Sequence, residues 1–157
     1  MGERFLKSIR LLAECMQGYE RLSGCYVRQS GLTHAQFDII ATLGNTAGMS
    51  YKELGEKTLI TKGTLTGVIE RLEQKGLVER QRSDCDKRSF FVRLTAEGER
   101  TFACAFPQVV QQSGKAFAHY SEDDFSALEA SLSALKAAIM TSLQECPSTP
   151  DSTKENF

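Results

Sequence analysis

Several residue patterns that would identify an enzyme or a membrane protein are missing from this sequence of 157 residues. No run approaches the roughly 20 apolar residues that a membrane helix needs, and the N-terminus lacks the pattern of a secretion signal. A Gly-rich phosphate loop, a nucleophile elbow and a metal-ligand motif are also missing, so we expect neither an enzyme nor a cofactor. The sequence therefore predicts a non-enzymatic, soluble protein of the cytoplasm.

Cysteine and histidine are few and widely spaced. The five cysteines form no C-x-x-C pair, and the two histidines, His34 and His119, have no cysteine or histidine partner at the spacing that zinc requires. These gaps argue against a disulfide framework and against a zinc ribbon, and they fit a reduced cytosol. We therefore predict no bound metal.

Charge is nearly balanced over the whole chain but not along it. The net charge is −1, which gives no overall electrostatic sign of a nucleic-acid partner. Basic residues are dense between Arg80 and Arg93, whereas acidic residues gather at Ser121-Glu122-Asp123-Asp124. A basic middle is what a local DNA-binding module would leave behind, although a solvated charged surface would look the same.

Two long amphipathic helices are predicted, one at each end of the chain. Apolar residues recur at steps of three and four over residues 5–26, and again without a miss over residues 125–143. Such seams must be buried, either against each other within one chain or between two copies. We expect residues 1–30 and 100–146 to form a helical dimerisation region.

Two short helices joined by a tight turn are predicted in the middle of the chain. Ser50 begins a capping box with Glu53, which opens the first of them. The second runs over residues 62–75, with Thr61 as its expected cap and Gly76 as its left-handed stop. Because its outer face is polar, the pair is typical of a helix-turn-helix.

A β-hairpin is predicted directly behind the second short helix. Residues 77–82 and 89–94 alternate with a period of two and are joined by a polar turn, and Thr95 then caps the next helix. The predicted fold class is mainly α with a small β-hairpin wing (α+β). It comprises a winged helix-turn-helix over residues 31–99, flanked by the dimerisation helices, with residues 147–157 as a flexible tail.

The central region resembles the transcription regulators of the MarR family in three fragments that stand in the family's order and spacing. These fragments are RLEQKGLVER at 71–80, DKR at 86–88 and LTAEG at 94–98. The resemblance implies a homodimer that binds a pseudo-palindromic operator of double-stranded DNA. Repression, relieved by an effector, is the family default.

The resemblance also implies which side chains meet DNA. The second helix of the motif would enter the major groove, and Arg88 of the wing would enter the minor groove, held in position by Asp86. Arg80, Arg82 and Lys87 are better interpreted as phosphate contacts or solvated strand charges. The predicted DNA-binding residues are Lys62, Gly63, Thr64, Thr66, Gly67, Arg82, Asp86, Lys87 and Arg88.

A small aromatic molecule is one expected effector, because members of the family commonly respond to small molecules or oxidants. Tyr19, Tyr26 and Phe37 are candidate walls of an apolar pocket for it. Each of the three also has the helical spacing of an ordinary core residue, so the core interpretation stays open.

An oxidant is the other expected effector. Cys15, Cys25 and Cys85 are candidate redox thiols, and basic neighbours of Cys85 would favour its thiolate. The family's hydroperoxide-sensing cysteine would fall near Ile9 instead, and a free cysteine is commonly a small buried hydrophobe. A thiol-based redox regulator therefore stays an alternative, as does, in a different class, a winged helix used for protein contact.

Overall fold

The computed structural model describes residues 3–82 and 90–145. By contacts the chain divides into two compact units, Met1–Ala116 and Phe117–Phe157. The predicted turn of the wing and the predicted C-terminal tail lie outside the described residues. Among the described helices, none is long and apolar enough to cross a membrane.

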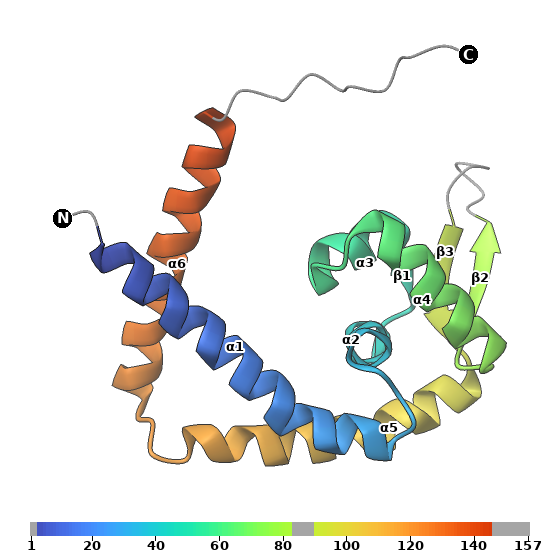
Figure 1. Ribbon diagram of the computed structural model, residues 1–157. Coiled ribbons are helices and arrows are strands. Elements are labelled where there is room, and N and C mark those ends of the chain that lie inside the picture. Colours follow the sequence, from blue (N-terminus) through green and yellow to red (C-terminus); the bar gives the residue numbers. More distant parts are fainter. Residues whose placement is uncertain (1–2, 83–89, 146–157) are drawn as a thin grey trace, which may run out of the picture. The chain divides into compact units, whose positions relative to one another are not determined.

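The described elements follow the predicted order and confirm the mainly α class with a small antiparallel sheet. They are α1 (Arg4–Gln29), α2 (His34–Leu43), β1 (Met49–Ser50), α3 (Tyr51–Thr58), α4 (Lys62–Gln74), β2 (Val78–Arg82), β3 (Phe90–Leu94), α5 (Ala96–Gly114), a 3-10 turn (Lys115–Phe117) and α6 (Glu122–Glu145). The predicted capping residues Ser50 and Thr95 both accept a backbone N–H at a helix start. Figure 1 shows these elements along the chain.

The sheet has three antiparallel strands in the order β1-β3-β2. The hairpin of β2 and β3 was predicted, whereas β1 was not, because two residues are too short to show a period of two. Met49 in β1 pairs with Val92 in β3. Gly48 precedes β1 with φ of +105°, and a Cβ there would lie 2.6 Å from the Val92 carbonyl oxygen, so the strand depends on this glycine.

One apolar core joins the helix-turn-helix, the sheet and α2. The capping box of Thr33 and Gln36 starts α2, which then buries most of its apolar side chains. The largest side chains that are almost fully buried come from α1, α2, α3, α4, β2 and β3: Val27, Ile39, Ile40, Leu43, Leu54, Leu65, Ile69, Leu72, Val78 and Val92. This core fixes α4 against the sheet and leaves its other face outside.

The helix α1 packs along α5 only over its C-terminal half (Figure 1). Its buried residues are Ser23, Gly24 and Val27, while Phe5 is 60% and Ile9 44% exposed. The apolar seam predicted for the N-terminus is therefore formed, but half of it has no cover within the described residues of the first unit.

The second unit begins with a local cluster and continues as one long helix. Rings of Phe117, Tyr120 and Phe125 lie with centroids 5.3–5.8 Å apart. Ser121 and Asp124 cap α6 reciprocally, and these hydrogen bonds hold the pKa of the Asp124 carboxyl below its ordinary value. No residue of α6 is buried in the described part of the unit, so its seam is exposed as well.

Candidate nucleic-acid interface

The helix α4 has one buried face and one open face. Leu65, Val68, Ile69 and Leu72 enter the core. Lys62, Gly63, Thr64 and Thr66 are exposed, and Gly67 is half-buried. The five positions predicted to read DNA therefore lie on the side of α4 that the core leaves free.

Two glycines in α4 have no packing reason to be glycine. A Cβ built on Gly63 or on Gly67 meets no atom within 4 Å. Each glycine inside a helix costs roughly 0.5–1 kcal/mol relative to alanine, because its backbone is freer in the unfolded chain. The bare backbone at these positions suits the close approach of something outside the chain.

The start of α4 differs from the prediction in its cap. Thr61 has the backbone conformation of an N-cap, but its side chain accepts no backbone N–H. Its hydroxyl instead donates to the Thr64 hydroxyl over 3.1 Å. Thr61 thus occupies the predicted N-cap position, but the expected side-chain cap is not formed. With Lys62 and no acid in this first turn, the helix start favours an anion such as phosphate.

The turn between α3 and α4 contains an unusual residue. Leu59 adopts φ of +58° and is 87% exposed. The left-handed conformation costs an L-residue with a Cβ roughly 1–2 kcal/mol, and exposure gives its apolar side chain no compensating burial. The next residue, Ile60, packs against the core. In this turn the strained backbone of Leu59 is therefore followed directly by Ile60, which the core holds in place.

The wing is described only at its base. β2 and β3 pair from Val78 with Leu94 to Arg82 with Phe90, and Arg82 is exposed at the end of β2. The predicted contacts Asp86, Lys87 and Arg88 lie outside the described residues, as does the candidate redox residue Cys85.

Arg80 fastens the base of the wing to the end of α4. Its guanidinium donates to the Glu73 carboxylate over 2.8 Å and 2.5 Å, and lies 5.5 Å from the centre of the Phe90 ring. The bond from Glu73 raises the pKa of Arg80 and lowers that of Glu73. Sequence reasoning left Arg80 between a phosphate contact and a strand charge, and the structure pairs it within the protein.

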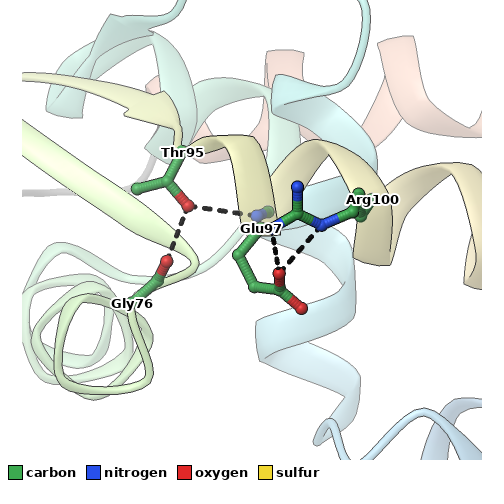
Figure 2. Close-up of polar contacts among 5 residues, drawn as sticks. Gly76, Thr95, Glu97 and Arg100 are labelled. Atoms are coloured by element: carbon green, nitrogen blue, oxygen red, sulfur yellow. Dashed lines mark hydrogen bonds and ion pairs between the residues drawn. The ribbon is translucent and has the colours of Figure 1, made fainter.

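The end of α4 is also joined to the start of α5. The Thr95 hydroxyl donates to the Gly76 carbonyl over 2.6 Å. Figure 2 shows this bond beside the ion pair of Arg100 with Glu97. Gly76 is left-handed with φ of +71°, as predicted for the stop of the helix. A Cβ on Gly98 would lie 2.0 Å from the Leu77 carbonyl oxygen. The KGL and LTAEG fragments therefore meet in space.

A cleft of about 720 Å³ lies between α3, the start of α4 and β3. Its walls include Tyr51, Ile60 and Phe90, together with Lys62 and Thr66 from the open face of α4. The Tyr51 hydroxyl is buried, and its interaction with the Arg80 guanidinium contributes to the raised pKa of Arg80. The cleft has the size and the mixed lining of a small-molecule site. No pattern in the sequence predicted this cleft.

The predicted pocket residues lie elsewhere. Tyr19 is 44% exposed on α1, Tyr26 is partly buried against the core, and Phe37 is buried on α2, stacked on Phe106 with ring centroids 6.5 Å apart. None of the three lines the cleft beside Tyr51. Their role as pocket walls stays a prediction.

The described redox candidates are exposed thiols, not buried ones. Cys15 and Cys25 are both free and exposed on α1. Arg28 donates to the Cys25 sulfur over 3.6 Å. Within the described ranges, no three histidine, cysteine or acidic side chains are grouped to hold a metal ion.

A helix-turn-helix whose second helix, α4, has an open face with a bare backbone, followed directly by a two-stranded wing, defines a winged-helix protein. The sequence model of the MarR family matches residues 32–90. The transcriptional regulator HosA of Escherichia coli is 40% identical over 76 residues, which are 48% of this chain and 56% of HosA. The chain thus spans about half the length of these curated relatives.

Solved structures extend the likeness to most of the chain. The transcriptional repressor CouR, bound to a 23-mer DNA duplex, matches with a TM-score of 0.73 at 25% identity, over 87% of this chain and 96% of that one. NadR in complex with 4-hydroxyphenylacetate matches with a TM-score of 0.68 at 26% identity, over 79% and 88%. The family model thus identifies residues 32–90, the winged helix-turn-helix of this chain, as a MarR-type domain. The similarity to transcriptional regulators supports the expectation of a non-enzymatic protein.

Proposed function

We propose that this protein is a homodimeric transcription repressor that binds an operator in double-stranded DNA. The observation that carries the proposal is the open face of α4, where Gly63 and Gly67 leave the backbone bare between Lys62 and Thr66. In a helix-turn-helix the second helix lies in the major groove, and a backbone without side chains approaches DNA closely. Hydroxyl and methyl groups of threonine suit base edges and thymine methyls.

The residues predicted to touch DNA divide into two groups. Lys62, Gly63, Thr64, Thr66 and Gly67 would lie in the major groove. Arg82 and Lys87 would neutralise phosphates, and Arg88, held by Asp86, would enter the minor groove. CouR, a relative of similar fold, is bound to a DNA duplex, which supports this arrangement.

A second copy of the chain is the proposed cover for the exposed seams. Phe5, Leu6 and Ile9 on α1 are 44–60% exposed, and Leu132 and Ile139 on α6 are 43% and 44% exposed. Amphipathic helices bury their apolar face when they are stable. A two-fold pairing would bury both seams and would present two copies of α4 to two half-sites, as a pseudo-palindromic operator requires.

The proposed effector is an aromatic acid. NadR, a relative of similar fold, binds 4-hydroxyphenylacetate. In the cleft beside Tyr51, the ammonium of Lys62 suits a carboxylate, and the buried Tyr51 hydroxyl suits a polar group of the ligand. Because Lys62 and Thr66 line the same cleft, a ligand there would compete with DNA. The pocket walls predicted at Tyr19, Tyr26 and Phe37 are the alternative place.

The test is a fluorescence-anisotropy titration of labelled duplexes at fixed salt. One duplex comes from the DNA upstream of the protein's own gene, and a scrambled duplex of equal composition is the control. We expect tight binding to the first, weak binding to the second, and release by 4-hydroxyphenylacetate. Equal, weak binding to both, repeated with duplexes selected from a random pool, would contradict DNA recognition and favour a protein-contact role for the wing.

Oxidant release is tested in the same titration. Peroxide is added to the complex of the wild-type protein and to that of a variant in which Cys15, Cys25 and Cys85 are serine. An aromatic effector predicts that neither complex responds. Release of the wild-type complex alone would favour the redox alternative.

A further inference from the structure

The side chain of Lys75 leaves α4 and reaches the junction of α1 and α2. Its ammonium donates to the Gly31 carbonyl over 2.7 Å and to the Gln36 side-chain oxygen over 3.2 Å. Lys75 is the C-cap residue of α4, so the contact starts at the end of that helix. It joins residues 44 and 39 positions apart in the sequence.

Both acceptors have a reason to attract a cation. Gly31 follows the end of α1, where unpaired carbonyls give the helix a partial negative charge. Gln36 is only 4% exposed and belongs to the capping box of α2, where its oxygen also accepts the Thr33 N–H over 3.1 Å. One ammonium thus bonds the end of α1 and the start of α2 together with the end of α4.

The residues on either side of Lys75 also make contacts to other elements. Glu73 is paired with Arg80 of the wing, and Gly76 accepts the Thr95 hydroxyl at the start of α5. Lys75 adds the connection to α1. The orientation of α4 relative to α1 is therefore fixed by a specific polar contact as well as by the core.

We propose that Lys75 is a positioning residue that sets the half-site spacing the dimer accepts, without touching DNA itself. This inference rests on the proposed DNA-binding function. If two copies pair through the exposed seam of α1, the angle between α1 and α4 decides how far apart the two copies of α4 stand. Half-sites are read about one helical turn apart, so this distance has to match the duplex.

The experiment varies the spacing. An operator is first selected from a random duplex pool with the wild-type protein, and one base pair is then inserted or removed at its two-fold centre. Each change moves the half-sites by roughly 3.4 Å and rotates them by roughly 35°. Dissociation constants are measured by anisotropy for the wild type, Lys75→Met and Lys75→Arg, with Lys115→Met as the control for lost charge.

The wild type should bind the altered duplexes roughly tenfold or more weakly than the selected operator, which is the loss expected for a mismatched site. Lys75→Met should lose less than about threefold, because its two copies of α4 adjust, while Lys75→Arg and Lys115→Met behave as the wild type. In Lys75→Met the slope of log binding constant against log salt concentration should be the same as in the wild type. Loss of one phosphate contact would reduce the size of this slope by about 0.9. A slope lowered in this way would overturn the positioning role.

The remaining outcomes separate the two proposals. If the wild type selects no operator, the proposed function fails and the role of Lys75 fails with it. If the wild type selects one and Lys75→Met keeps the same spacing discrimination, only the role of Lys75 is overturned. Should Lys75→Met not fold, as judged by circular dichroism, Lys75→Gln is measured in its place, because its shorter side chain cannot make both contacts.

Discussion

The hydroxyl of Thr95 serves two backbones at once. It donates to the Gly76 carbonyl over 2.6 Å and accepts the Gly98 N–H over 3.1 Å. The first bond satisfies a carbonyl beyond the end of α4, and the second satisfies one of the free amides at the start of α5. A single side chain therefore bonds the residue that follows α4 and also caps the start of α5.

Removing this hydroxyl should destabilise the protein. We expect Thr95→Ala to lower the free energy of unfolding by about 1–2 kcal/mol, the upper range for an N-cap, because a second bond is lost with it. Urea denaturation followed by circular dichroism measures the change. Thr95→Ser keeps the hydroxyl and should stay close to the wild type. Equal losses in both variants would mean that the methyl group, not the hydroxyl, matters.

The ion pair of Glu73 with Arg80 predicts a pH dependence. Arg80 holds the pKa of Glu73 below its ordinary value of 4.5, so the folded state binds this proton less readily than the unfolded state. The stabilisation is therefore complete above pH 4.5 and is lost as the pH falls through the lower folded value.

Comparison of the wild type with Glu73→Gln between pH 7 and pH 3 tests this sign. The difference in stability should be largest near pH 7 and should shrink at the acid end. Glu70→Gln is the control, because that carboxylate lies 3.9 Å from the Arg80 guanidinium and not within hydrogen-bond distance. A difference that grows as the pH falls would contradict the assignment.

Leu59 predicts a stabilising substitution. Glycine adopts φ of +58° without strain, so Leu59→Gly should raise the free energy of unfolding by roughly 0.5–1 kcal/mol after the entropy of the freer unfolded chain is subtracted. Thermal and urea unfolding measure it. The matched control is Gly31→Ala. Gly31 has φ of +73° and open space around a new Cβ, so this substitution should lower the free energy of unfolding by about 1 kcal/mol. A loss of stability in Leu59→Gly would show that its side chain has a partner.

The two glycines of α4 predict opposite effects on stability and on binding. Gly63→Ala and Gly67→Ala should each stabilise the protein by roughly 0.5–1 kcal/mol, because the new methyl meets nothing in the chain. Each should also weaken operator binding, because the methyl would meet DNA. Gly18→Ala, in equally open space on α1, should stabilise without weakening binding. Unchanged operator affinity in both α4 variants would contradict the proposal that the α4 backbone approaches DNA closely.

Arg88 predicts a binding effect that depends on the wing. From the family pattern we expect Arg88→Ala to weaken operator binding by about 1–3 kcal/mol, the usual worth of a specific contact. A mobility-shift titration at fixed salt measures it. Stability should not change. Unchanged affinity would contradict a minor-groove role for this arginine.

Local signals explain what the sequence could predict. The Ser50 and Glu53 capping box, the cap at Thr95 and the left-handed Gly76 each depend on residues within four positions, and the structure confirms all of them. The hairpin followed from alternation alone. Thr61 occupies the predicted N-cap position, but its hydroxyl bonds the Thr64 hydroxyl and no backbone N–H, and the sequence does not say which partner a hydroxyl takes.

The rest of the site depends on contacts between distant parts of the chain. The bond from Lys75 to Gly31 spans 44 positions, and no periodicity connects them. Leu59 carries no sign of a positive φ, because leucine seldom adopts one. The cleft beside Tyr51 exists only where two helices and a strand meet. The DNA contacts and the pairing of two chains stay predictions from sequence and family.

The aromatic cluster at the start of α6 has a consequence for the order of folding. Phe117, Tyr120 and Phe125 lie within nine positions of one another, and the Ser121–Asp124 cap spans three. Closing so short a loop costs little chain entropy, whereas the Gly76–Thr95 contact has to close a loop through the wing. Contacts of low sequence separation form fast. We therefore expect this corner to form early, so that α6 begins as a nucleated helix before the longer-range contacts of the first unit have closed.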